Sequence, residues 1–247
     1  MPPDVVIADW NGTLVEYKDE RPLLENTARD VFKASFPWHP LRTARILSAR
    51  EELRTLDSNG VRKGDSDFIR ELFRIYNERI IEEVPLPVIL RSVEQYAHSP
   101  QTQNKLEYRA LRPIRACHKA GKLTGIFSAG YGHGIERILT AAGYVHDFDF
   151  IEADVLAQKD GKAIGFGLNL YQRKPEYLQK LLSAKNLDPR KVAYMADTED
   201  EAGCFEIAGY PIVAFTATDE LKEKFARKYK AFVPKDEKDL ADFLSCS

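Results

Sequence analysis

The stretch DVVIADWNGT, residues 4–13, decides the fold of this 247-residue chain. Its first part, residues 4–9, is a short run rich in β-branched residues that closes on Asp9. Gly12 and Thr13 follow at once. A run of this kind is typical of a strand buried on both faces that ends in a loop. The stretch therefore predicts a first strand with a carboxylate at its carboxyl end.

Four later apolar runs predict further buried strands of the same kind. They are KLTGIFS at 122–128, FDFIEA at 148–153, KVAYMAD at 191–197 and PIVAF at 211–215. Between them, residues 174–185 and 218–229 carry apolar side chains at helical spacing. Strands that alternate with helices predict an α/β fold with a doubly wound parallel sheet. In such a fold the ligand crevice lies beyond the carboxyl ends of the strands.

Residues 18–105 interrupt this alternation. Helical stripes run through the segment without a convincing strand, and proline and glycine mark the joins between the stripes. We therefore expect an α-helical cap domain inserted directly after the first strand. The core domain would then consist of residues 1–17 and 106–247, and the cap of residues 18–105.

Composition and charge exclude several classes of function. Charged residues make up 30% of the chain, yet the formal net charge is only -2, so we expect no general attraction to nucleic acid or to an anionic membrane. No segment approaches the length of a membrane span. Cys117, Cys204 and Cys246 lie far apart, a pattern that fits reduced thiols better than a disulfide framework or a zinc site. These features predict a cytoplasmic protein, and none of them indicates an oligomeric state.

Two groups of polar residues follow the first two strands where chemistry could take place. A carboxylate such as Asp9 can attack phosphorus as a nucleophile, and Gly12 would let the backbone approach a phosphate closely. Ser128, Ala129 and Gly130 could present a hydroxyl and backbone N–H groups to phosphoryl oxygens. Each group alone has a commoner structural explanation, as an acid in a loop or as a turn.

Two further charged features stand at the later strands and helices. Lys174 precedes a helix that Pro175 is suited to begin, so its ammonium could neutralise both Asp9 and a phosphate. Residues 197–201 read DTEDE, and so many acids at the end of a buried strand are costly unless they are solvated or paired with a cation. Mg²⁺ favours one or two carboxylates together with waters and substrate phosphate. A solvated lysine and an acidic helix N-terminus are the commoner explanations.

Taken in order, Asp-x-x-Gly-Thr, Ser, Lys and the acidic loop resemble the four motifs of the haloacid dehalogenase-like (HAD) superfamily. The C-terminal half is most similar to the phosphoserine phosphatase-like branch, whose S-G-G-F sequence resembles residues 128–131, SAGY. The similarity covers residues 4–16 and about 106–244, and the insertion matches by position only.

The resemblance implies a Mg²⁺-dependent phosphohydrolase that works through an aspartyl-phosphate on Asp9. The catalytic residues would be Asp9, Asn11 and Lys174. The metal would be held by Asp9, the Asn11 backbone carbonyl and Asp197, with Glu201 at the outer acidic position. The phosphoryl group would be bound by Thr13, Ser128, Ala129, Gly130 and Lys174. The substrate would be a small phosphorylated metabolite. The helical insertion would close over the site and select the leaving group.

The sequence departs from the family pattern at Asn11, where phosphatases usually have an aspartate that protonates the leaving oxygen. An asparagine cannot ionise, and general acid/base help is typically worth ~10²–10⁴-fold. His133 could replace that acid, although a solvated or capping histidine is the commoner case. Ala196 and Glu201 also stand where glycine and aspartate are usual.

These departures leave two alternative functions open. One is a catalytically weak relative that binds a phosphorylated ligand or partner, which Asn11 favours. The other is a phosphonate hydrolase that cleaves a C–P bond, because Asp9-Trp10-x-Gly-Thr resembles the motif of that family. Such an enzyme also needs a lysine that forms a Schiff base, and Lys33 and Lys63 are nominal candidates.

Overall fold

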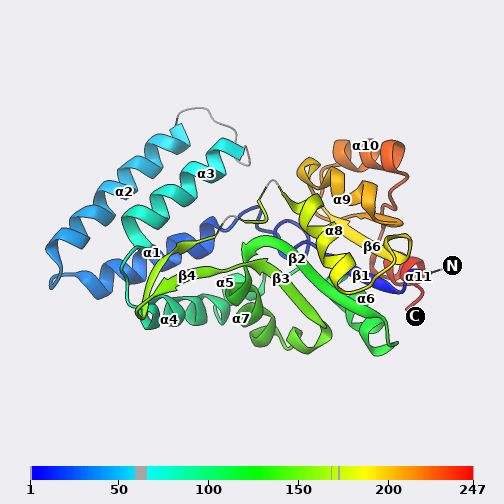
Figure 1. The fold of residues 1–247 in the computed structure, drawn as a ribbon, viewed down its shortest axis with the longest axis horizontal. Helices are drawn as coiled ribbons and strands as arrows, with labels where there is room; N and C mark the ends of the chain where they lie inside the picture. Colours follow the sequence, from blue (N-terminus) through cyan, green and yellow to red (C-terminus); the bar gives the residue numbers. More distant parts are fainter. Residues whose placement is uncertain (1, 59–65, 168, 172, 247) are drawn as a thin grey trace.

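The computed structural model describes residues 2–58, 66–167, 169–171 and 173–246. At its centre lies a five-stranded sheet in the order β3-β2-β1-β6-β7, in which every neighbouring pair is parallel. The strands are β1 (Val5–Ala8), β2 (Leu123–Tyr131), β3 (Phe150–Asp154), β6 (Val192–Ala196) and β7 (Tyr210–Val213). Helices flank this sheet (Figure 1), which confirms the predicted α/β fold.

Strand β1 lies in the middle of the sheet, where the strand order reverses. The chain builds β2 and β3 on one side of β1 and then returns to place β6 and β7 on the other side. Ligands of open parallel sheets bind at such a reversal point. The backbone N–H of Asp9 donates to the carbonyl of Met195 at 2.9 Å, so the loops after β1 and β6 begin side by side.

Alternate residues of β1 face opposite layers of helices, as the period of a strand requires. Val6 and Ala8 pack with α6 (Tyr108–Lys119), α7 (Gly132–Ala142) and α11 (Glu237–Leu244). Val5 and Ile7 pack with α8 (Lys174–Ala184), α9 (Ala202–Ile207) and α10 (Asp219–Tyr229). Both apolar faces of the strand are thereby covered, which explains why its residues are all buried.

Two of these helices begin where the sequence predicted. Pro175 lies in the first turn of α8, so Lys174 is held at the amino end of that helix. Thr218 caps α10, since its side chain accepts a hydrogen bond from the N–H of Leu221 at 3.3 Å. Both amino ends lie at the edge of the sheet that carries the polar loops, since Lys174 and Thr218 line one pocket together with Asp9 and Asp197.

The segment between β1 and α6 is helical, as expected. It contains α1 (Arg21–Ser35), α2 (Pro40–Ser58), α3 (Ser66–Ile75), the π-helix η1 (Tyr76–Ile81), α4 (Leu86–Ala97) and the short α5 (Pro100–Gln103). Helices α1, α2 and α3 form an arm at one end of the molecule (Figure 1), while α4 packs on both α1 and the core helix α7. The division at residues 18 and 105 remains a prediction.

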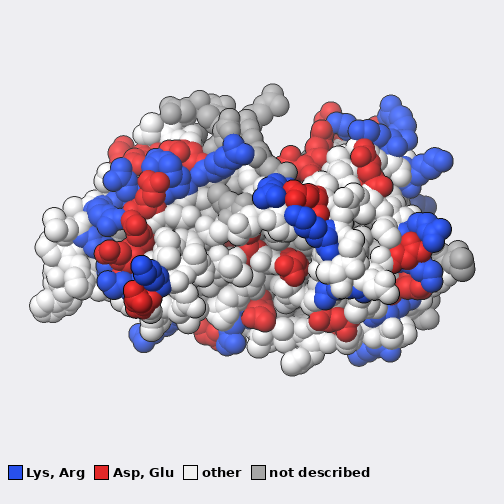
Figure 2. Space-filling view, viewed as in Figure 1, with Lys and Arg blue, Asp and Glu red and all other residues white. Residues whose placement is uncertain are grey.

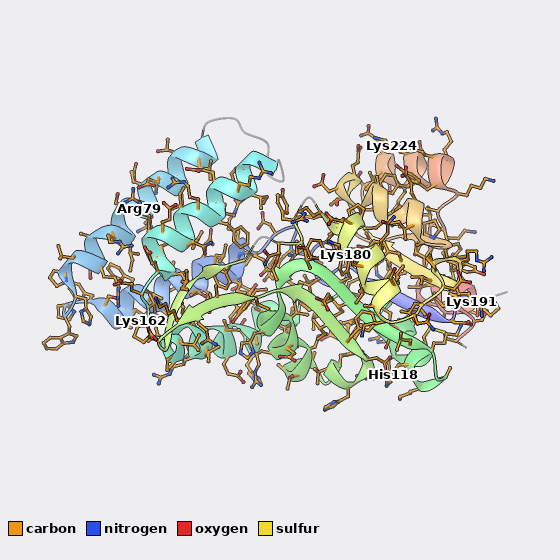
Figure 3. The ribbon with its side chains drawn as sticks, viewed as in Figure 1. Arg79, His118, Lys162, Lys180, Lys191 and Lys224 are labelled. Atoms are coloured by element: carbon orange, nitrogen blue, oxygen red, sulfur yellow. A yellow bond between two sulfur atoms is a disulfide. The ribbon has the colours of Figure 1, made fainter. Side chains whose placement is uncertain are left out.

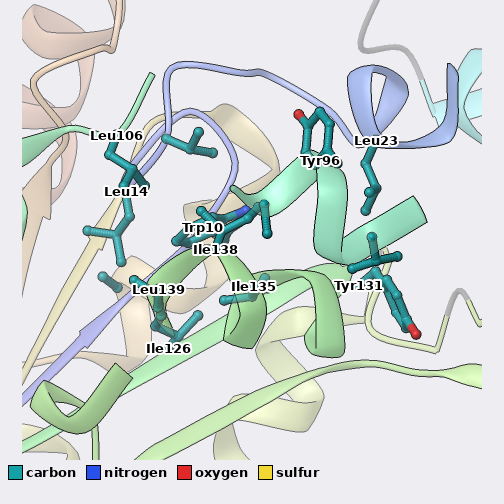
Figure 4. Packing of buried hydrophobic residues seen from close by; sticks show 14 of the residues in the cluster. Trp10, Leu14, Leu23, Tyr96, Leu106, Ile126, Tyr131, Ile135, Ile138 and Leu139 are labelled. Atoms are coloured by element: carbon teal, nitrogen blue, oxygen red, sulfur yellow. The ribbon is translucent and has the colours of Figure 1, made fainter. Parts of the chain in front are cut away.

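One apolar cluster runs from beneath the sheet into the insertion. Trp10 and Ile138 lie near its centre, and Leu23 of α1 and Tyr96 of α4 extend it (Figure 4). Trp10 is 2% exposed, and its carbonyl accepts hydrogen bonds from three successive N–H groups, at residues 13–15. The loop that carries the site residues after Asp9 is therefore fixed from below by a buried indole and by its own backbone.

A β-hairpin that the sequence did not predict extends from the core towards the insertion. It consists of β4 (Leu156–Lys159) and β5 (Lys162–Phe166), which pair antiparallel around a turn at Asp160 and Gly161 with positive φ. The side chain of Asn77 in η1 accepts from the N–H of Phe166 at 2.8 Å and donates to its carbonyl at 3.0 Å. In Figure 3, Lys162 accordingly lies on the same side of the molecule as Arg79 of the insertion.

The prediction of three reduced thiols is wrong. Cys117 of α6 and Cys246 form a disulfide, and only Cys204 is free. The two partners are 129 positions apart and meet because α11 packs against α6, which sequence spacing cannot reveal. The cysteines therefore no longer support a reducing compartment, and the cytoplasmic location stays a prediction.

The surface carries charge of both signs. On the face seen in Figure 2, lysine and arginine lie beside aspartate and glutamate over the insertion and the core alike. This agrees with the near-balanced composition. In the described part of the chain, no helix is both long and apolar enough to cross a membrane.

Candidate active site

A cavity of about 580 Å³ opens at the carboxyl ends of β1, β2 and β6. The sequence predicted eight of the residues that line it: Asp9, Asn11, Ser128, Ala129, Gly130, Lys174, Asp197 and Glu201. They come together because parallel strands end at one edge of the sheet. Ile69 and Phe73 of α3 line the same cavity, so the insertion contributes apolar surface to it.

Lys174 and Asp9 form a buried ion pair. The Nζ atom lies 2.8 Å from Asp9 Oδ1 and also contacts Glu201 Oε1, and both Lys174 and Asp9 are less than a tenth exposed. Burial alone would lower the pKa of Lys174, but the carboxylates of Asp9 and Glu201 outweigh it and hold the pKa above its ordinary value. Lys174 is therefore a fixed positive charge beside the expected nucleophile.

Glu201 is bound at both of its oxygens. One contacts Lys174, and the other accepts a hydrogen bond from the hydroxyl of Tyr194 at 2.6 Å. Burial raises the pKa of Glu201 to about 7, although Lys174 opposes that rise. Glu201 thus holds Lys174 in place in this structure. Each oxygen keeps a further acceptor site, so these contacts leave Glu201 able to accept from a metal-bound water.

Asp197 follows β6 and is 3% exposed. Its Oδ2 accepts from Lys18 Nζ at 2.5 Å, whereas its Oδ1 is buried and has no hydrogen-bond partner among the described residues. Burial raises the pKa of Asp197, with Lys18 acting against it and the charge of Asp9 adding to it. A buried acceptor left without a donor is costly, so Oδ1 is suited to a cation.

Gly12 brings the loop after β1 against Asp197. Its φ is +70°, and a Cβ placed there would lie 2.2 Å from Asp197 Oδ2. Any other residue would be strained at this φ and would displace the carboxylate, which explains the glycine of the motif.

The donors around Asp197 fit Mg²⁺. Asp9 and Asp197 supply two carboxylates and Asn11 can supply a backbone carbonyl, a set of hard oxygen ligands that leaves room for waters and phosphate. No group of three or more His, Cys, Asp or Glu gathers as a metal site within the described ranges, but Mg²⁺ needs only one or two protein carboxylates.

The end of β2 forms the other wall of the cavity. Ser128 Oγ accepts a hydrogen bond from the N–H of Gly130 at 3.0 Å, and the pairing of β2 with β3 shifts register between Ser128 and Tyr131. A Cβ at Gly130 would come 2.4 Å from an oxygen of Glu20. The wall therefore holds a buried hydroxyl and a glycine that leaves space for that carboxylate.

Glu20 is a site residue that the sequence reasoning missed. Its Oε1 accepts from Asn11 Nδ2 at 3.1 Å and from the N–H of Tyr131 at 3.4 Å, and burial raises its pKa to about 7. Asn11 occupies the position where the motif usually has an aspartate, and its amide cannot ionise. Glu20 therefore places an ionisable carboxyl group next to the side chain of Asn11. Its only signal in the sequence is its place in an acidic pair just before α1.

The sequence reasoning also missed Lys18 and Tyr194. Lys18 reaches Asp197 across 179 positions, and Tyr194 reads as an ordinary core residue of β6. No local pattern in the sequence marks either contact.

Other candidates do not line the cavity. Thr13 is fully buried beneath the loop, and its hydroxyl has no hydrogen-bond partner in the part of the chain described. His133 lies on α7 with Nδ1 3.8 Å from Glu136, and Lys33 lies exposed on α1, 3.6 Å from Asp30. Lys63 lies outside the described residues.

No family model matches the sequence, and neither does any curated protein. Solved structures are similar in fold. A phosphoserine phosphatase in its apo form has a TM-score of 0.57 at 17% identity, with 91% of each chain covered. A HAD family hydrolase from Salmonella enterica subsp. enterica serovar Typhi has a TM-score of 0.55 at 16% identity, covering 91% of this chain and 66% of that one. A cytosolic 5'-nucleotidase IIIB bound to cytidine has a TM-score of 0.61 at 14% identity, covering 99% and 86%. The TM-scores establish likeness of fold, and at that level they confirm the resemblance predicted from the motifs.

Proposed function

We propose that this chain, which has the fold of the haloacid dehalogenase-like superfamily, is a Mg²⁺-dependent phosphohydrolase that acts through an aspartyl-phosphate on Asp9. The observation that carries the proposal is the buried pair of Asp9 and Lys174, 2.8 Å apart at the tip of the central strand. A carboxylate held beside a cation at the wall of a cavity is suited to attack an anionic phosphoryl group, because the cation offsets the repulsion between them.

The chemistry divides into two displacements at phosphorus. An oxygen of Asp9 attacks, a new P–O bond forms to the carboxylate, and the bond to the leaving oxygen breaks; that oxygen takes its proton from solvent. Water then attacks the same phosphorus, loses a proton to solvent, and breaks the bond between Asp9 and phosphorus, which releases phosphate and free Asp9. Lys174 and the hydroxyl of Ser128 would hold the phosphoryl oxygens throughout. Mg²⁺, when held by Asp9, Asp197 and the Asn11 carbonyl, would neutralise charge on those oxygens.

The leaving group is where this site differs from the usual family pattern. The amide of Asn11 cannot give a proton to a leaving oxygen, and its Nδ2 is directed to Glu20. Substrates whose leaving group is a weak base need little protonation and should react best. Within the proposed substrate class, a small phosphorylated metabolite, the site should therefore favour compounds with such a leaving group.

Two alternatives remain. Asn11 favours a weak relative that binds a phosphorylated ligand without rapid turnover. Cleavage of a C–P bond would require a lysine free to form a Schiff base. Among the described residues of the insertion, the lysine that lines the cavity is Lys18, and it is paired with Asp197.

Hydrolysis of p-nitrophenyl phosphate with and without Mg²⁺ tests the proposal. Wild type should turn over only with Mg²⁺, Asp9→Asn should lose all turnover while keeping its circular dichroism spectrum, and the exposed Asp242→Asn should behave as wild type. Turnover by Asp9→Asn at the wild-type rate would refute the proposal. Binding of the phosphate ester without turnover would favour the weak relative, and turnover of phosphonoacetaldehyde alone would favour the phosphonate reaction.

A further inference from the structure

Lys18 places a positive charge of the chain itself on the expected metal-binding carboxylate. Its Nζ lies 2.5 Å from Asp197 Oδ2 and 3.3 Å from the carbonyl oxygen of Thr216. The side chain of Asp197 is 1% exposed, whereas that of Lys18 is 54% exposed. The pair therefore joins a fixed, buried anion to a cation that reaches it from solvent.

The two oxygens of Asp197 have different surroundings. Oδ2 receives the ammonium of Lys18, while Oδ1 is buried without a hydrogen-bond donor among the residues described. A divalent ion on Oδ1 would share one carboxylate with the ammonium on Oδ2. Since the oxygens of one carboxylate lie about 2 Å apart, the two cations would sit only a few ångströms from each other and repel.

Asp197 has little freedom to relieve that repulsion. The Cα of Gly12 stands so close that a Cβ there would be 2.2 Å from Oδ2. The loop of Gly12 is itself held, because the hydroxyl of Thr216 donates to the Gly12 carbonyl. Lys18, half exposed on a flexible four-carbon stem, is the partner that can move.

We propose that Lys18 is the resident counter-ion of Asp197 and a positioning residue that weakens the affinity of this site for divalent cations. It neutralises and orients Asp197 while no metal is bound, and its ammonium moves away from Oδ2 when a divalent ion takes Oδ1. The inference rests on the proposed function in one respect, that Asp197 is a ligand of that ion. The charge that controls metal binding then lies on residue 18, the expected first residue of the insertion.

Isothermal titration of the full-length protein with MgCl₂, without substrate, tests this directly. Lys18→Met removes the charge and keeps most of the stem, so it should bind Mg²⁺ about tenfold more tightly, since water around the half-exposed lysine screens part of the repulsion. Lys18→Arg should bind as wild type does. The exposed Lys33→Met, which removes a lysine on α1 that does not line the cavity, is the matched control and should not change the affinity.

The Mg²⁺ dependence of hydrolysis is a second measurement, and it distinguishes control of Mg²⁺ affinity from a purely structural role of Lys18. In Lys18→Met the Mg²⁺ concentration for half-maximal hydrolysis should fall about tenfold, while kcat at saturating Mg²⁺ stays near wild type. Lys18→Gln repeats the test should Lys18→Met fail to fold. Unchanged or weaker Mg²⁺ binding by a folded charge-removing variant would overturn the inference, and so would tighter binding by Lys18→Arg.

These results are separable from those that test the proposed function. A tighter Mg²⁺ complex in Lys18→Met without hydrolysis by any variant would support the role of Lys18 and refute the phosphohydrolase. Mg²⁺-dependent hydrolysis with equal Mg²⁺ affinity in all variants would support the phosphohydrolase and refute the role of Lys18.

Discussion

Replacing Glu20 with glutamine should stabilise the protein at alkaline pH and leave its stability unchanged in acid. Burial raises the pKa of Glu20 from 4.5 to about 7. Above that value the carboxylate is charged in both the folded and the unfolded chain, and folding carries the full cost of burying the charge. At 1.36 kcal/mol for each pKa unit, the shift corresponds to about 3 kcal/mol.

The pH window follows from the sign of the shift. Because the folded state binds the proton more tightly, the contribution of Glu20 is absent below pH 4.5 and becomes progressively destabilising as the pH rises to 7. A glutamine keeps the carbonyl oxygen that accepts from Asn11 Nδ2 and from the N–H of Tyr131. The variant should therefore lose the cost of the charge without losing these contacts.

Urea unfolding of both proteins at pH 4, 6 and 8, in EDTA, measures the difference in the free energy of unfolding. We expect a difference near zero at pH 4 that grows to about 3 kcal/mol in favour of the variant at pH 8. Glu25→Gln, at an exposed position of α1, the helix that Glu20 precedes, should show no such trend. A difference that is the same at every pH, or none at pH 8, would refute the reasoning.

Three other predictions concern the metal and the leaving group. Asn11→Asp should raise kcat/KM with Mg²⁺ more for an alkyl phosphate than for an aryl phosphate, by up to ~10²–10⁴-fold, because an alkoxide needs the proton that a carboxylic acid can give; no gain on either ester would contradict this. Asp197→Ala should weaken Mg²⁺ binding in calorimetry far more than Asp200→Ala, since Asp197 stands directly after β6, and equal losses would undo the assignment. Gly12→Ala should lower both the melting temperature and the Mg²⁺ affinity, because its Cβ would lie 2.2 Å from Asp197 Oδ2 and its φ is +70°; wild-type values would argue against that contact.

The sequence predicts the sheet and much of the cavity for one physical reason. A run such as residues 4–9 is typical of a strand buried in the middle of a parallel sheet, and the residue after each such strand then reaches the common edge. Asp9 and Asp197 meet for that reason, since they directly follow β1 and β6, and Ser128 joins them from the last residues of β2. Lys174 joins them because Pro175 fixes the start of its helix.

Contacts made by the insertion could not be predicted in this way. Glu20 and Lys18 reach the site only through the path of the chain between β1 and α1, which no periodicity encodes. The hairpin of β4 and β5 was missed because much of β4 is exposed, so its sequence lacks the apolar pattern of a buried strand. Its Asp-Gly turn, a common hairpin signal, was the one indication available.

The hairpin has a consequence for exchanging parts between relatives. Glu83, Val84 and Leu86 form backbone hydrogen bonds with Gly161 and Ala163, and Gly165 approaches Asn77 so closely that a Cβ there would lie 2.7 Å from its side chain. Residues 18–105 are therefore not a self-contained module, because their structure is completed by the hairpin at residues 156–166. A chimera that transplants only residues 18–105 would leave polar backbone groups unpaired on both partners, whereas one that also carries residues 156–166 would transfer the whole interlocked unit.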